Sequence, residues 1–378
     1  MSEIVPGFPR VSAAVQDGIS RGLQTGIQIY VSVGGQPVID GGYGMATRSI
    51  PMTPYTIMPW RSAGKPLTVV LLIRMLNQNM EPGREELNDE QLRTQVKAWL
   101  PEFADSEIGD TTLQQILTHT GGFPMAETGW PSVGWKESLE RLRRATREAP
   151  TGTAAYHPQS SWFLLGEICR RLSGTEAGFS ELMLAHVLEP LGMLDTSAGR
   201  SLEEYWVKRE QMPTLYERVG ASMEVSAYSE PPYATQESPG ASLRGPVRDL
   251  GRFYEMMMRG GVTSNGERWI CDELLRKCTL RHREAEYDRT FQHTVDFGLG
   301  WIVNSNRYGE QTVPYGFGRL STEAAFGHGG SQCSMAFCDP ERQIVVAWSA
   351  NGFCGEGQHQ RRNRNLNESI YSDIFGPE

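Results

Sequence analysis

The chain lacks the features that mark membrane and nucleic-acid-binding proteins. No stretch approaches the roughly 18 consecutive apolar residues that a membrane span requires, and residues 1–7 show no basic region followed by an apolar segment. Lys and Arg together number 36 against 45 for Asp and Glu, and no dense basic run could follow a phosphate backbone. We therefore expect no nucleic-acid partner, no membrane partner and a cytoplasmic location.

Cysteine is also scarce, with six residues in 378. None of the six forms a CxxC pair, so their spacing favours neither a zinc site nor a disulfide framework. We expect reduced structural thiols, no metal site and no cofactor. The content of 39% hydrophobic and 21% charged residues is typical of a soluble globular protein with a large core.

Strand-like segments lie near both ends of the chain. Residues 27–33 alternate and are rich in β-branched side chains, and Gly34-Gly35 then turns the chain into 37–39, which predicts a hairpin. Residues 335–337 and 344–348 flank a turn-forming segment and predict a second hairpin. Helix-like segments are expected at the two ends, over about 10–24 and from about 361.

The middle of the chain differs, because from Leu67 to about Gly260 it consists mainly of helix-length segments such as 161–172, 179–188 and 246–259. This segregation predicts an antiparallel sheet made from both chain ends and flanked by the terminal helices, with a helical domain inserted between them. We place the α/β sheet domain at 1–60 and 285–378 and the mainly helical domain at 61–284. A small-molecule site is expected in the cleft between them.

A serine and a lysine stand three residues apart at the start of an apolar segment. Ser62-Ala63-Gly64-Lys65 leads into Leu67–Leu76, whose nearly continuous apolar character predicts a helix buried all round. In a first turn, positions i and i+3 share a face, so Lys65 can reach the Ser62 hydroxyl. A buried lysine that loses its proton can activate that serine as a nucleophile. Ser62 as a mere helix cap and Lys65 as a solvated lysine are the alternatives.

Two later segments complete a pattern. Tyr156-His157-Pro158 lies on a loop before an apolar helix, and His328-Gly329-Gly330-Ser331 precedes the C-terminal hairpin. In order and spacing, the three segments resemble the SxxK, tyrosine and KTG boxes of the serine β-lactamase and penicillin-binding-protein family. Four further stretches also resemble it: 113–122, 189–193, 247–253 and 297–301. The resemblance is greatest to the class C β-lactamase branch and implies the β-lactamase/DD-peptidase fold.

The resemblance implies a role for each motif residue. The expected catalytic residues are Ser62 as nucleophile, Lys65 as base, Tyr156 as proton relay and His328 as a supporting group. Backbone N–H groups of Ser62 and Ser331 are expected to stabilise the oxyanion. The expected substrate-binding residues are His157, Ser160, Gly329, Gly330 and Ser331, with His157 and Ser160 equally consistent with loop structure. Tyr156 as a packing residue and His328 as a structural histidine are the alternatives.

Two departures from the β-lactamase pattern bear on the substrate. The position of the asparagine in Tyr-x-Asn is Pro158, and the position of the lysine in Lys-Thr-Gly is His328. The histidine is similar to the pattern of family VIII carboxylesterases and of acyltransferases of this fold. We therefore expect an acyl-serine enzyme acting on a small-molecule ester, as a carboxylesterase or as a transacylase to an amine or alcohol. The alternatives are a β-lactamase or DD-peptidase, an amidase on small amides, and a non-catalytic ligand-binding protein.

A second serine motif is a decoy. Gly18-Ile19-Ser20-Arg21-Gly22 spells the GxSxG nucleophile elbow of α/β-hydrolases. That elbow requires a preceding strand, whereas this stretch lies inside a helix-like segment. We therefore expect no catalytic role for Ser20.

Overall fold

The computed structural model describes residues 3–376, and its central element is a six-stranded antiparallel sheet. The strand order is β2-β1-β12-β11-β10-β9, so the two N-terminal strands lie directly beside the C-terminal ones. The strands are β1 (Gly26–Val33), β2 (Gln36–Gly44), β9 (Ile302–Val303), β10 (Phe326–Gly330), β11 (Ser334–Asp339) and β12 (Ile344–Ala350). The prediction of a sheet built from both ends of the chain is confirmed.

Both predicted hairpins are present. β1 and β2 pair across Gly34-Gly35, whose φ angles of 56° and 76° suit glycine because it has no Cβ. β11 and β12 pair from Ser334 opposite Ser349 to Asp339 opposite Ile344. Every residue of these two strands is buried, so the centre of the sheet is covered on both faces.

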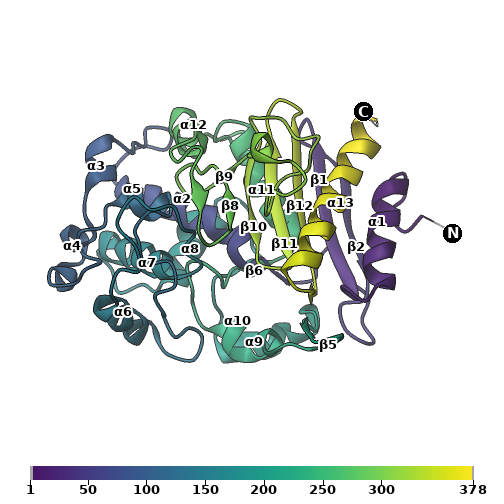
Figure 1. The fold of residues 1–378 in the computed structure, drawn as a ribbon, viewed down its shortest axis with the longest axis horizontal. Helices are drawn as coiled ribbons and strands as arrows, with labels where there is room; N and C mark the ends of the chain where they lie inside the picture. The colour runs from purple at the N-terminus through teal and green to yellow at the C-terminus, as the bar shows by residue number, and fades with distance from the viewer. Residues whose placement is uncertain (1–2, 377–378) are drawn as a thin grey trace.

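Helices cover the two faces. α1 (Pro9–Ser20) and α13 (Glu356–Phe375) run side by side on one face, where the backbone N–H groups of Arg10 and Val11 donate to Asp373 (Figure 1). α11 (Val247–Met258) packs on the other face, where the Tyr30 hydroxyl donates to Glu255 at 2.6 Å. Helix α1 ends at Ser20, before the predicted end near residue 24, and helix α13 begins at Glu356, before the predicted start near residue 361.

Helices α2 to α8 form the left side of the molecule in Figure 1, while α9 and α10 lie at its lower edge and α12 at its upper edge. They are α2 (Lys65–Leu76), α3 (Asp89–Arg93), α4 (Val96–Trp99), α5 (Leu113–Leu117), α6 (Trp135–Arg144), α7 (Ser160–Ser173), α8 (Phe179–Met183), α9 (Leu202–Lys208), α10 (Pro231–Thr235) and α12 (Asp272–Thr279). Short 3₁₀ segments are Arg61–Gly64, Pro101–Phe103, Arg209–Gln211, Ala227–Ser229 and Asn306–Tyr308.

The helices predicted in the middle of the chain are found. Residues 161–172 lie in α7, and 246–259 correspond to α11. Residues 179–188 form α8 followed by a π-helical turn, Leu184–Leu188. α11 falls within 61–284 but packs on the sheet, and the domain boundaries stay a prediction.

Within residues 3–376, seven short strands lie outside the main sheet and form one three-stranded sheet, β13-β4-β5, and the two pairs β3-β6 and β7-β8. They are β3 (Met58–Pro59), β4 (Tyr216–Val219), β5 (Ser222–Val225), β6 (Arg244–Gly245), β7 (Tyr287–Asp288), β8 (His293–Thr294) and β13 (Gly352–Phe353). The pair of β3 with β6 matters for the site, because β3 leads directly into the turn that carries Ser62.

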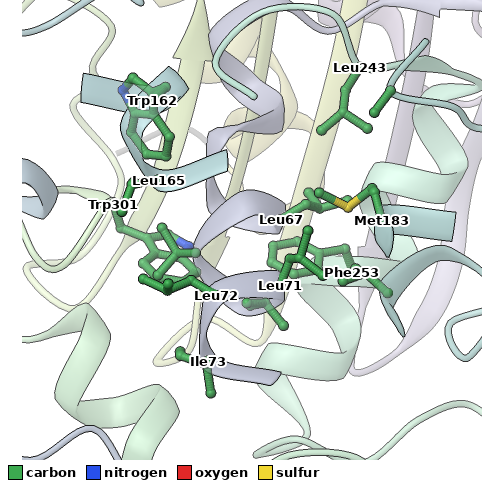
Figure 2. Close-up of a cluster of buried hydrophobic side chains, with 14 of the residues drawn as sticks. Leu67, Leu71, Leu72, Ile73, Trp162, Leu165, Met183, Leu243, Phe253 and Trp301 are labelled. Carbon is green, nitrogen blue, oxygen red and sulfur yellow. The ribbon is translucent and has the colours of Figure 1, made fainter. Parts of the chain in front are cut away.

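Helix α2 is buried on every side, as its apolar sequence predicts. From Lys65 to Ile73 every residue is buried. Figure 2 shows Leu67, Leu71 and Leu72 surrounded by side chains from other elements, among them Trp162, Phe253 and Trp301. Because the whole surface of α2 is packed, the helix holds its first turn in a fixed position.

The prediction places Ser62 in the first turn of this helix, whereas α2 begins at Lys65. Ser62 lies in the preceding 3₁₀ turn, Arg61–Gly64. An α-helical bond to the Ser62 carbonyl would have to come from residue 66, which is a proline without an N–H. The Lys65 N–H donates to that carbonyl instead, so the turn tightens to 3₁₀ geometry.

Among residues 3–376, none of the helices combines the length and apolar character needed to cross a membrane.

Candidate active site

Lys65 lies directly behind Ser62. Its side chain is fully buried, and Nζ is 3.1 Å from the Ser62 Oγ. Nζ also donates to the backbone carbonyls of Pro158 and Gly240, each at 2.7 Å. Burial, helped by the positive charge of Arg61, holds the pKa of Lys65 well below its usual value.

These contacts fit a neutral amine. A neutral lysine has two N–H bonds, which the two carbonyls can accept, and one lone pair, which is then free to face the serine hydroxyl. An ammonium group would have to surrender its hydration to a site that offers no carboxylate contact. Lys65 is therefore placed to take the proton of Ser62.

Tyr156 is held rigidly on the loop before α7. Its backbone N–H donates to Asp288 at 3.0 Å, and its carbonyl accepts from Thr290 at 2.9 Å. Its ring lies 4.6 Å, centroid to centroid, from both Phe291 and His119. The hydroxyl makes no hydrogen bond of good geometry, although it lies close enough to Ser62 to interact with it. Burial raises the pKa of Tyr156, and the Ser62 hydroxyl opposes that effect only in part, so the phenol is protonated at neutral pH.

His328 lies on β10 and is almost completely buried. Its Nδ1 is 2.7 Å from the Gly329 carbonyl, so Nδ1 carries the proton and Nε2 is the acceptor nitrogen. Burial and the nearby Lys65 lower the pKa of His328 to about 3. The imidazole is therefore neutral, unlike the lysine that it replaces in the Lys-Thr-Gly box.

The backbone is bent at two points beside the nucleophile. Arg61, immediately before Ser62, has a φ of 52°, and Gln332, immediately after Ser331, has a φ of 55°. Side chains other than glycine seldom adopt this left-handed region, and such residues cluster at functional sites. The two bends shape the segments that present the Ser62 and Ser331 backbone groups.

A cavity of about 540 Å³ joins the three motifs. Five of the expected site residues line it: Ser62, Tyr156, His328, Gly329 and Ser331. Phe291 and Tyr315 add aromatic wall, and the Tyr315 hydroxyl donates to Glu356 at the start of α13. A larger cavity of about 780 Å³ between α8 and α9 contains none of the expected residues.

Three expected substrate-binding residues do not line this cavity. His157 is fully buried behind the loop, where its N–H donates to the His119 Nδ1 at 3.0 Å. Ser160 is buried too and donates to the Phe123 carbonyl at 2.9 Å. Gly330 is the last residue of β10, beneath the cavity. It lies so close to the segment before Ser62 that an added Cβ would be 2.2 Å from the Trp60 carbonyl oxygen. In this structure all three support the site from behind.

Several site residues have no signature in the sequence. Pro158 and Gly240 contribute only backbone carbonyls, which any residue type could supply. Asp288 accepts the hydrogen bond that fixes the backbone of Tyr156, and it is itself buried and paired with Arg283 at 2.8 Å. Neither Asp288 nor Arg283 belongs to a sequence motif. Arg61 could have been noticed, since it adjoins Ser62 and lines the cavity.

Within the described part of the chain, no group of three or more His, Cys, Asp or Glu side chains is arranged to hold a metal ion. All six cysteines are free thiols.

The architecture is the β-lactamase/DD-peptidase fold, as comparison with solved structures shows. A family VIII carboxylesterase is 21% identical, with a TM-score of 0.75 and 99% of both chains covered. A hydrolase with promiscuous acyltransferase activity is 19% identical, with a TM-score of 0.75 and 96% of this chain and 97% of the other covered. At these identities the likeness shows the fold alone.

The sequence itself places the chain in a family. The Beta-lactamase family model matches residues 11–369, and the chain belongs to that family. A putative D-alanyl-D-alanine carboxypeptidase of Escherichia coli strain K12 is 23% identical over 308 residues. That match covers 72% of this chain and 66% of the relative, so a third of the relative has no counterpart in it.

Proposed function

We propose that the protein is an acyl-serine enzyme that acts on a small-molecule ester, as a carboxylesterase or as an ATP-independent transacylase to an amine or alcohol. The observation that carries this proposal is the buried Lys65 amine, hydrogen-bonded to the Ser62 hydroxyl at the floor of the cavity. A lysine with only a structural role would have no need to be neutral beside a serine that faces a cavity. This arrangement argues against a non-catalytic binding protein.

In the first half of the cycle, the Ser62 Oγ forms a bond to the ester carbonyl carbon while its proton passes to the Lys65 Nζ. The negative charge that develops on the carbonyl oxygen is received by backbone N–H groups of Ser62 and Ser331. The bond to the leaving oxygen then breaks, and that oxygen takes a proton from Tyr156, which recovers one from Lys65. The products are the free alcohol and acyl-Ser62.

In the second half, a water, amine or alcohol attacks the acyl carbon. Lys65, neutral again, accepts the proton of the attacking group through Tyr156, and the Ser62 oxygen leaves and is reprotonated. Water gives the free acid, whereas an amine or alcohol gives an amide or a new ester. The two outcomes share the same acyl-enzyme, so the choice rests on which acceptor occupies the cavity.

The ester reading rests on two features of the site. Pro158 offers Lys65 a carbonyl but has no side-chain amide for a lactam, and the neutral His328 replaces a cation that would attract a β-lactam carboxylate. A carboxylesterase and a hydrolase with acyltransferase activity have the same fold. The alternative is a DD-peptidase, β-lactamase or amidase, which the name of the Escherichia coli relative favours.

The nucleophile is tested by intact-mass measurement after exposure to an activated ester. We expect the wild-type protein to gain one acyl mass and Ser62→Ala to gain none. Ser20→Ala is the matched control, because Ser20 ends α1 with its hydroxyl bonded to the Asp17 carbonyl, and it should acylate normally. An acyl adduct on Ser62→Ala would refute the proposal.

The substrate class is tested by comparing a simple activated ester with a chromogenic cephalosporin. We expect a higher kcat/KM for the ester, because the site lacks the asparagine of the Tyr-x-Asn box and the lysine of the Lys-Thr-Gly box. An equal or higher kcat/KM for the cephalosporin would favour the alternative. Adding amines or alcohols then separates the two ester reactions, since a constant share of free acid at every acceptor concentration marks a plain hydrolase.

A further inference from the structure

Arg61 stands beside the nucleophile with most of its hydrogen-bonding capacity unused. Its Nη2 donates to the Tyr228 hydroxyl at 2.9 Å, and the guanidinium lies 4.0 Å from the centroid of that ring. A guanidinium has five N–H donors, and Nη1 is buried without a partner. The backbone of Arg61 has a left-handed conformation, which strains a residue with a side chain but would not strain a glycine.

Arg61 also lines a second, smaller cavity of about 210 Å³. This side pocket shares Arg61 and Ser331 with the main cavity, so the two adjoin at these residues, one on each side of the proposed oxyanion site. Its other walls include Arg218, Glu217 and Tyr228. The volume is enough for a short chain that ends in a small polar group.

The side pocket carries an excess of positive charge. Among the described residues, no ion pair joins the guanidinium of Arg61 or Arg218 to a carboxylate, and Glu217 is the one acidic side chain in the lining. Behind Arg61 lies the buried Arg244, whose pKa is lowered to about 10 by burial and by repulsion from Arg61. An anion in the pocket would relieve this repulsion.

The proposed mechanism assigns the two cavities to different parts of the ester. The leaving alcohol must lie near Tyr156, which protonates it, and Tyr156 faces the part of the cavity formed by Phe291 and Tyr315. Arg61 and Ser331, whose N–H is proposed to receive the carbonyl oxygen, line both cavities, whereas Tyr156, Phe291 and Tyr315 line only the main one and Tyr228 only the side pocket. The part of the substrate that extends past Ser331 toward Arg61 is therefore the acyl chain.

We propose that the acyl group of the substrate ends in a carboxylate, which Arg61 binds in the side pocket with help from Arg218. The substrate class is then a monoester of a short dicarboxylic acid, and Arg61 is a specificity-determining residue. A carboxylate fits a guanidinium through two parallel hydrogen bonds, which explains an arginine at a position where a smaller residue would be less strained. This inference rests on the proposed acyl-serine function.

The experiment compares three aryl esters of matched size: one with a neutral acyl chain, one with a terminal carboxylate on the acyl chain, and one with the carboxylate on the aryl group. Acyl chains from malonyl to adipoyl cover the possible reach. For the wild-type protein we expect the best carboxylated acyl ester to exceed its neutral counterpart at least about tenfold in kcat/KM. The ester with its carboxylate on the aryl group should show no such preference.

Variants assign the preference to Arg61. Arg61→Gln should lower the ratio of the two kcat/KM values at least about tenfold, and Arg61→Lys should restore part of it. Glu217→Gln should raise the ratio, since it removes the competing negative charge. The control for net charge is Arg93→Gln on α3, whose side chain is 77% exposed, and it should leave the ratio unchanged.

The outcomes separate the two proposals. Turnover of the neutral ester as fast as the carboxylated acyl ester, a preference for the carboxylate on the aryl group, or an unchanged ratio in Arg61→Gln would each overturn the role of Arg61 while the acyl-serine function stands. Failure of every ester to acylate Ser62 would overturn both. The ratio is the readout because Arg61 also affects Lys65 and can change the absolute rates.

Discussion

The chemistry of this site depends on the burial of one side chain. The proposed base role of Lys65 depends on the packing of α2, which buries the amine with two carbonyls and a serine as its hydrogen-bond partners. The same residue on an exposed helix would remain an ammonium group and could not accept a proton. Arg61 adds to the effect through repulsion.

Replacing Lys65 with alanine should lower the rate of acylation by at least about a hundredfold, because Ser62 loses the base that takes its proton. The matched control is Lys97→Ala, since Lys97 is half-buried on α4, paired with Asp110, and does not line the cavity. Single-turnover acylation with an activated ester measures the effect. A rate above about a hundredth of wild type would transfer the base role to Tyr156.

The pH dependence of acylation follows from the same residue. The pKa of Lys65 is lowered, so the amine is already neutral well below the pH at which a free lysine loses its proton. The pH at which acylation rises should therefore lie well below the pH at which a free lysine loses its proton, and the rate should fall as the pH is lowered further and Lys65 takes up a proton. A rate that rises only above pH 10 would show that Lys65 keeps an ordinary pKa.

At the scale of elements, the site depends on the contact between β10 and the turn that carries Ser62. Ser334, opposite Gly330 at the start of β11, donates to the Trp60 carbonyl at 2.6 Å. Gly330 allows this approach because a side chain there would strike both the Trp60 carbonyl and the Ser334 hydroxyl. The absence of a side chain at Gly330 thus allows Ser62 and Ser331 to lie close together.

Gly330→Ala should separate β10 from that turn and lower esterase kcat/KM at least about tenfold, since the oxyanion donors move apart. The comparison variant is Gly134→Ala, because a Cβ at Gly134 meets no atom within 4 Å and the residue does not line the cavity. Activity and thermal unfolding are measured for both. If Gly330→Ala kept normal activity, the spacing of these two elements would not control catalysis.

At the scale of the whole molecule, the fold buries several histidines in the neutral form. The pKa values of His157 and His328 are lowered to about 3, chiefly by burial, and that of His119 is well below its usual value. The unfolded chain binds protons at these positions near pH 6.5, whereas the folded chain does not until about pH 3. The free energy of unfolding therefore falls as the pH falls through this window.

Each such histidine should lower the free energy of unfolding by about 2 kcal/mol between pH 6.5 and pH 5. Urea unfolding at the two pH values measures the total, and His328→Asn should reduce the loss by the share of one histidine. If the variant lost as much stability as the wild type over this interval, His328 would be protonated in the folded state.

Much of the fold and the proximity of Ser62, Lys65 and Tyr156 could be predicted from the sequence. Periodicity, turn residues and apolar runs act locally, so the two hairpins, helix α2 and the sheet built from both chain ends were all expected. The motifs indicated Ser62, Lys65 and Tyr156 because their chemistry requires particular side chains at a particular spacing. The position of Ser62 relative to α2 was predicted less accurately. It lies in the 3₁₀ turn before the helix, because Pro66 has no N–H to donate to the Ser62 carbonyl and Lys65 donates instead.

Only the tertiary structure decided how each residue takes part. It placed Lys65 among carbonyls from Pro158 and Gly240, which no pattern could reveal because every residue has a carbonyl. It turned His157 and Ser160 away from the cavity, since a loop residue faces whichever side its neighbours leave open. It also brought Arg61 beside Arg218, which lies more than a hundred residues later in the chain. The sequence determined which chemical groups are present, and packing between distant segments determined which of them meet.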